Sequence, residues 1–125
     1  MNENDLSYEV IGIALDLHRN LGPGLLESAY QAALVYDLIE SGFNVRKEVP
    51  IPFMYKNVSM GIGYKMDILV EEKLIIEVKS IEILAPVHFT QLQTYLKLSN
   101  KKLGLLINFN SKMLKDGIHR IVNGL

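Results

Sequence analysis

The chain has 125 residues and a formal net charge of −1, with 49% hydrophobic and 22% charged residues. That is the length of one domain, and the composition argues against disorder. The lack of cysteine excludes disulfide scaffolds, thiolate zinc sites, iron–sulfur clusters and cysteine nucleophiles. No apolar run approaches the roughly 20 residues of a membrane span, and the start MNENDLSYEV lacks a signal peptide's basic residues. We therefore expect one cytoplasmic domain over residues 1–125.

Charge is distributed unevenly along the chain. Residues 1–82 carry seven basic and thirteen acidic side chains, a balance of −6, whereas residues 83–125 carry six basic and one acidic, a balance of +5. Such a split fits an acidic site beside a basic flank, although charge alone favours ordinary solvated lysines. The basic residues of the second segment are Lys97, Lys101, Lys102, Lys112, Lys115 and Arg120.

Hydrophobic periodicity predicts a mixed order of helices and strands. Apolar residues at spacings of three and four indicate helices, and alternation indicates strands. Pro50 and Pro52 indicate an edge strand or a bulge, and Pro86 suits the first turn of a helix. The order predicts a mixed sheet with helices on its faces. In chain order we expect helices over 5–20 and 25–40, strands over 45–51, 58–63, 64–70 and 73–80, a helix over 87–98, a strand over 102–109 and a final strand over 118–122.

The segment from Tyr64 to Ser80 carries charge on an otherwise apolar hairpin. Matching the hydrophobic faces of its two strands pairs Val70 with Leu74. In that register Asp67 lies opposite Glu77, on a face that also holds Lys79. At ~4 Å and an effective dielectric near 20, two opposed carboxylates repel by ~4 kcal/mol. Either Lys79 or a divalent cation, which prefers oxygen ligands, is expected to offset this repulsion.

Two helices carry further polar pairs that share a face. Glu27 and Tyr30 lie three residues apart at the start of the second helix, and Gln91 and Tyr95 lie four apart in the third. Each pair has a purely structural interpretation. Acids favour the first turn of a helix, Tyr30 suits a core aromatic with a wet hydroxyl, and the Gln91 face suits packing against a sheet.

The sequence resembles a known family, the bacterial GxxExxY proteins, on the motif Gly24-x-x-Glu27-x-x-Tyr30. The resemblance extends over essentially the whole chain. It includes Asn2-Glu3-Asn4, the segment LGPGLLE at 21–27, Pro86-Val87-His88, Gln91-Leu92, Tyr95-Leu96-Lys97 and the segment GLLINFN at 104–110. This family is similar to small members of the PD-(D/E)xK nuclease superfamily. That likeness implies a restriction-endonuclease-like αβββαβ core with an extra N-terminal helix.

The resemblance also implies Mg²⁺- or Mn²⁺-dependent phosphodiester hydrolysis and a set of site residues. Asp67 and Glu77 match the metal ligands, the Val78 carbonyl a further ligand, and Lys79 the lysine of the Glu-x-Lys element. Glu27 matches the helical acid that some branches use as a metal ligand. Gln91 and Tyr95 match a Gln-x-x-x-Tyr element. In one departure, Met66 stands where the superfamily motif has proline.

A nuclease of this kind is expected to act on nucleic acid, with DNA favoured over RNA, and a homodimer is the expected assembly. The basic 83–125 segment would then hold backbone phosphates. The alternative is a non-catalytic nucleic-acid-binding or dimeric interaction protein on a nuclease-like scaffold, because superfamily folds also include inactive proteins.

Overall fold

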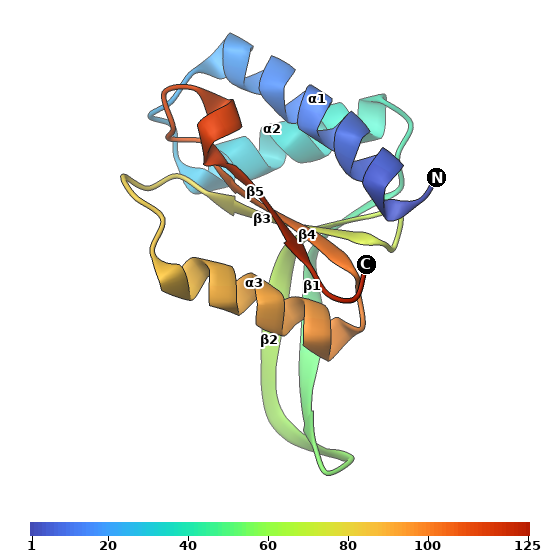
Figure 1. Ribbon diagram of the computed structural model, residues 1–125. Coiled ribbons are helices and arrows are strands. Elements are labelled where there is room, and N and C mark those ends of the chain that lie inside the picture. Colours follow the sequence, from blue (N-terminus) through green and yellow to red (C-terminus); the bar gives the residue numbers. More distant parts are fainter.

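Helices cover both faces of a five-stranded sheet in the computed structural model, which describes residues 1–125 (Figure 1). Two helices, α1 and α2, lie on one face, and α3 lies on the other. This is the mixed α/β architecture expected from the sequence, with an αβββαβ core and an additional N-terminal helix. The elements are α1 (Glu3–Leu21), α2 (Glu27–Glu40), β1 (Val45–Tyr55), β2 (Val58–Val70), β3 (Leu74–Lys79), α3 (Pro86–Ser99), β4 (Leu103–Asn108), η1 (Leu114–Gly117) and β5 (Ile118–Val122).

The strands lie in sequence order across the sheet, from β1 to β5. All neighbouring pairs are antiparallel except β3 and β4, which α3 connects as a parallel pair. Val70 pairs with Leu74, which confirms the predicted register of the central hairpin. Because β3 and β4 are parallel, their carboxyl ends meet at one edge of the sheet. Lys79 and Asn108 stand there as a pair.

Two hydrophobic cores hold the layers together. The larger core packs α1 and α2 on one face of the sheet, and the smaller core packs α3 on the other. Ile68 and Val70 face the larger core, as alternation predicts. Met66 belongs instead to the smaller core, although strict alternation along β2 would place it on the face of Ile68 and Val70. Strand β2 therefore changes face at Asp67, the residue between them.

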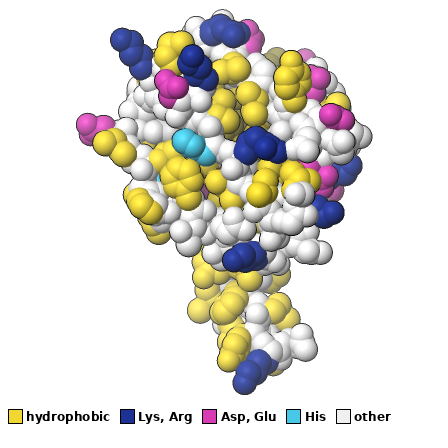
Figure 2. Space-filling view, in the orientation of Figure 1, with side chains coloured by type: hydrophobic (Ala, Val, Ile, Leu, Met, Phe, Trp, Pro, Cys, Tyr) yellow, Lys and Arg dark blue, Asp and Glu magenta, His cyan; other side chains and the backbone are white.

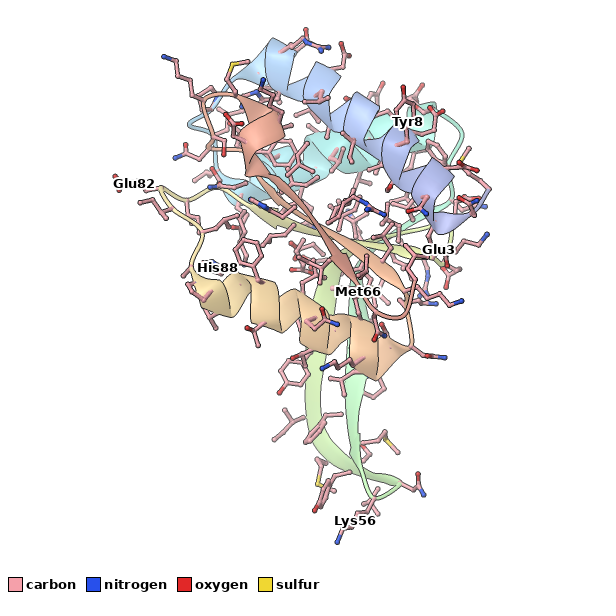
Figure 3. The ribbon with its side chains drawn as sticks, viewed as in Figure 1. Glu3, Tyr8, Lys56, Met66, Glu82 and His88 are labelled. Carbon is pink, nitrogen blue, oxygen red and sulfur yellow. The ribbon has the colours of Figure 1, made fainter.

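The segment 58–70 forms one strand, not the two expected from the sequence. With β1 it builds a long hairpin that projects from the body (Figure 1). We call residues 52–63 the arm. At its tip, Lys56 and Asn57 have φ values of 49° and 63°. Positive φ at two successive residues is typical of the tight turns that connect hairpin strands. Figure 3 shows Lys56 at this tip, far from Met66, which lies where the hairpin joins the body.

A close approach between β4 and α3 gives a prediction about stability. A Cβ atom added at Gly104 would lie 2.9 Å from Leu92 Cδ1 in the smaller core. We expect Gly104→Ala to lower the free energy of unfolding by about 1–3 kcal/mol, because overpacking forces side chains out of their rotamers. Gly12→Ala on α1, where no atom lies within 4 Å, serves as the control. Equal stability of the two variants in urea unfolding would contradict this packing.

Candidate active site

Strands β2 and β3 separate at Asp67 and Glu77. Their backbone pairing covers three residue pairs and ends at Ile68 with Ile76. Beyond this point β2 continues along β1 into the arm, while β3 stays paired with β4. We call this branching point the fork. Backbone groups left unpaired at such a point must find other partners.

The carboxylates of Asp67 and Glu77 supply those partners. The Asp67 backbone N–H donates to Glu77 Oε1 at 3.0 Å, and the Val78 backbone N–H donates to Asp67 Oδ2 at 2.9 Å. Each carboxylate therefore replaces an acceptor of the sheet ladder and is held rigidly in the fork. No N–H group donates to the second oxygen of either carboxylate, so these two oxygens are not used by the backbone.

Burial and mutual repulsion perturb both acids. Removal from water raises the pKa of Glu77 to about 8, and the charge of Asp67 contributes to this rise. Burial also raises the pKa of Asp67. This effect outweighs the lowering of that pKa by the Val78 N–H and the Lys79 charge. Two neighbouring acids with raised pKa values are a frequent sign of a functional site.

Lys79 is the last residue of β3 and is half-buried at the same edge. Its charge lowers the pKa values of both Asp67 and Glu77, so it lies near them. It nevertheless forms no ion pair within 4.0 Å of a carboxylate. The sequence offered two ways to offset the repulsion in the fork, Lys79 or a divalent cation. A direct Lys79–Glu77 ion pair is not formed, so the first does not apply.

Helix α3 contributes Tyr95 to the site. Its side chain is 6% exposed, and its hydroxyl pKa is raised by burial and then by the charges of Glu77 and Asp67. Gln91 is exposed one turn earlier on the same helix and makes no side-chain hydrogen bond. The structure thus brings Tyr95 to the acid pair and leaves Gln91 at the solvent-facing margin.

The motif at the start of α2 has two parts with different tasks. The Tyr30 ring is buried and stacks on Phe109 at 4.8 Å, and its hydroxyl donates to the Gly22 carbonyl and accepts from the Leu25 N–H. Tyr30 thereby clamps the loop before α2, in which Gly24 has a φ of 102° that glycine tolerates best. Glu27 is exposed, and its charge raises the pKa of Asp67.

Glu27 faces the fork without joining the acid pair. Gln31, one turn later on the same face of α2, donates from Nε2 to the Asp67 carbonyl at 3.4 Å. No three acidic or histidine side chains in the structure converge closely enough to hold a metal ion by themselves. Asp67 and Glu77 therefore form the centre, and Glu27 lies outside it.

A sequence model of the PD-(D/E)XK nuclease superfamily matches residues 4–121. The chain belongs to this superfamily. Neither the curated proteins nor the solved structures contain a significant match. Membership in a nuclease superfamily implies a nucleic-acid substrate, and nucleases of this superfamily typically use divalent metals. No helix of the chain has the length and apolar character needed to cross a bilayer.

Two polar residues at the fork were not predicted from the sequence. Glu48 lies in β1 between Lys47 and Val49, whose partners flank Asp67. Its φ is 55°, its charge raises the pKa of Asp67, and its Oε2 lies 3.4 Å from Lys65 Nζ. The register of β1 against β2 would have revealed it, but the prolines in β1 obscured that pairing.

Asn108 is the second missed residue, at the end of β4. It is 4% exposed, and its side chain accepts from the Ile81 N–H at 3.1 Å and donates to the Ile81 carbonyl at 2.9 Å. These bonds fix the segment after Lys79. Because Asn108 lies at the end of an apolar run, no short-range pattern identified it.

Proposed function

We propose that this chain is a divalent-metal-dependent nuclease that hydrolyses phosphodiester bonds, with residues 1–125 acting as one domain. The single observation that supports this most strongly is the fork, in which Asp67 and Glu77 are held side by side by backbone N–H groups. The Gly24–Tyr30 motif assigns the chain to the GxxExxY branch. We further propose that DNA is its preferred substrate and that it acts in the cytoplasm.

The donor set of the fork fits Mg²⁺ or Mn²⁺. Each carboxylate keeps one oxygen that no N–H group engages, and hard cations prefer such oxygen ligands. A cation between the two would also relieve the repulsion that raises their pKa values. Asp67, Glu77 and the Val78 carbonyl would hold the ion, with Glu27 as a more distant acid that helps attract it.

The chain's own groups then have distinct tasks. A bound divalent ion supplies Lewis-acid chemistry, which polarises the phosphate and lowers the pKa of the attacking water. Lys79, which no carboxylate engages, would orient the attacking water or stabilise negative charge as it develops on the phosphate. Tyr95 and Gln91 would line the substrate side, where the Tyr95 hydroxyl can donate to a phosphate oxygen.

A cleavage assay tests this proposal. The purified chain is incubated with single-stranded DNA, double-stranded DNA and RNA in Mg²⁺, in Mn²⁺ and in EDTA. We expect fragmentation of DNA in either metal and none in EDTA. Binding that persists in EDTA, without cleavage in either metal, would instead support the alternative of a non-catalytic nucleic-acid-binding protein.

We also propose that the chain forms a homodimer through the arm. Large apolar side chains gather there (Figure 2), and a two-stranded hairpin standing alone in water is marginally stable. Lys56 is the only charged residue between Pro50 and Tyr64, so the arm suits an apolar partner and not a phosphate backbone. The exposed fractions are Met54 50%, Tyr55 55%, Val58 58%, Met60 40% and Ile62 62%.

The area and charge of the arm favour a second copy as that partner. Five large apolar side chains, each 40–62% exposed, form one apolar surface on the arm. A standard interface buries about 800 Å² per partner, so the base of the arm would also take part. A net charge of −1 gives two copies little repulsion. In a two-fold dimer the same apolar surface meets itself.

Oligomeric state in solution tests the arm. We expect sedimentation velocity at micromolar concentration to report a dimer for the wild type and a monomer for Tyr55→Ser combined with Ile62→Asp. The control is Tyr36→Ser, which removes a 65% exposed tyrosine from α2, outside the arm, and should leave the dimer intact. A monomeric wild type, or an arm variant that remains dimeric, would contradict this assembly.

A further inference from the structure

A second cavity lies outside the fork, between the end of α1 and the segment after β4. Its volume is about 420 Å³, which is within the size range of small-ligand sites. It takes residues from both segments. The six that matter for its chemistry are Leu15, His18, Arg19, Lys112, Met113 and Lys115.

The rim of this cavity is basic and is not neutralised. Arg19, Lys112 and Lys115 line it, and no acidic side chain does. Lys112 and Lys115 form no ion pair, and Arg19 has only a 3.9 Å contact with Asp16 between highly exposed side chains. Exposed pairs of this kind contribute little. Three positive charges thus surround one concave site in a chain whose net charge is −1.

The inner wall of the cavity is apolar and rigid. Leu114 is 3% exposed and belongs to the larger core, and Leu15 packs against that core. His18 is 8% exposed, and its Nε2 lies 3.2 Å from the Phe109 carbonyl oxygen. A basic rim over an apolar wall suits a ligand with an anionic end and a flat apolar end.

The cavity adjoins the fork through a short loop. Gly22 and Pro23 form part of its wall, and two residues later the Leu25 carbonyl accepts from Ser80 Oγ at 2.6 Å. Ser80 follows Lys79 directly, and the Phe109 N–H donates to the Lys79 carbonyl at 2.8 Å.

The basic residues of the 83–125 segment are not one flank. Lys101 and Lys102 precede β4, whereas Lys112 and Lys115 follow it, at the end near Lys79.

We propose that this cavity binds one unpaired nucleotide of the nucleic-acid substrate, beside the phosphodiester bond that is cut. Its phosphate contacts Arg19, Lys112 and Lys115, and its sugar and base lie against Leu15 and Met113. This inference rests on the proposed nuclease function and adds the substrate feature that the fork lacks. The fork provides chemistry for any phosphodiester, whereas a basic cavity beside it selects a strand with a free nucleotide.

An NMR titration of the full chain with thymidine 5′-monophosphate, in EDTA, tests the site directly. We expect amide shifts at Arg19, Gly22, Lys112 and Met113. Inorganic phosphate should produce smaller shifts, confined to the rim. No shift at these amides would overturn the site, and equal shifts with both probes would reduce it to a simple anion site and overturn the nucleotide assignment.

Charge-removal variants provide the second measurement. We expect Lys112→Ala with Lys115→Ala to weaken binding of a 5′-phosphorylated oligothymidylate in EDTA by about tenfold at low salt. The slope of log K against log salt should fall by about 0.7, since the cavity holds one phosphate and each single-strand phosphate contact contributes about 0.7. Lys101→Ala with Lys102→Ala removes the same charge at the other end of β4. Equal weakening by both pairs would overturn the proposal.

The two proposals fail in different ways. Binding in EDTA does not require cleavage. Loss of affinity in the Lys112→Ala Lys115→Ala variant therefore supports the cavity independently of the catalytic assignment. A wild type that binds through the cavity and never cleaves would overturn the nuclease function alone. If the wild type cleaves, and the Lys112→Ala Lys115→Ala variant binds and cleaves equally well, the cavity proposal alone is overturned.

Discussion

Replacing Lys79 by alanine is expected to reduce Mg²⁺-dependent cleavage by at least about 100-fold. Removing one preorganised group that stabilises developing negative charge typically costs 10²–10³ in rate. Lys79 lies at the fork without an ion-pair partner, so its removal breaks no structural contact of that kind. We expect circular dichroism and the thermal unfolding midpoint to change little. Initial rates on a labelled DNA substrate at saturating Mg²⁺ measure the loss.

Two companion variants make this result specific. Asp67→Ala should abolish cleavage to a similar or greater extent, because it removes half of the acid pair. Lys73→Ala removes a lysine just before β3, at the opposite end of that strand, and should cleave at the wild-type rate. Equal cleavage by wild type, Lys79→Ala and Asp67→Ala would refute the catalytic assignment.

The second large effect concerns stability without metal. At pH 8.5 we expect the free energy of unfolding of Glu77→Gln, measured in urea, to exceed that of the wild type by about 2 kcal/mol or more. Burial raises the pKa of Glu77 from 4.5 to about 8 in the folded chain. The folded state therefore holds the proton more tightly than the unfolded one. This group's contribution to the free energy of unfolding is fully present below pH 4.5 and is lost as pH rises towards 8.

Glutamine cannot ionise, so the variant lacks this loss. Its amide oxygen can still accept from the Asp67 N–H, and its amide nitrogen can donate to the Asp67 carboxylate. The stability difference should shrink at pH 5. Mg²⁺ should raise the unfolding temperature of the wild type and leave the variant unchanged. Glu9→Gln, on the exposed surface of α1, is the control. A destabilised Glu77→Gln at pH 8.5 would count against the repulsive acid pair.

Local patterns predicted much of this fold. Apolar spacing located three helices and the buried run of β4, and matching hydrophobic faces fixed the β2–β3 register from Val70 and Leu74. That register was enough to bring Asp67 and Glu77 opposite one another. Such features depend on residues close in sequence, which is why the sequence alone reveals them.

The features that escaped prediction depend on contacts between distant segments. The change of face at Asp67 occurs where β2 leaves β3 and follows β1, which alternation within one strand does not reveal. Glu48 reaches the fork through that same pairing. Lys101 and Lys112 flank the predicted strand 102–109, and only the parallel pairing of β3 with β4 shows that Lys112 lies at the end near Lys79. Long-range topology therefore decides which charges belong to the site.

The most direct test of the central claim is a crystal structure of the chain grown with Mn²⁺ and measured at the manganese absorption edge. The proposed function predicts an anomalous peak between the carboxylates of Asp67 and Glu77, in contact with the two oxygens that no N–H group engages. A fork without manganese, in which Lys79 instead forms an ion pair with Glu77, would contradict it.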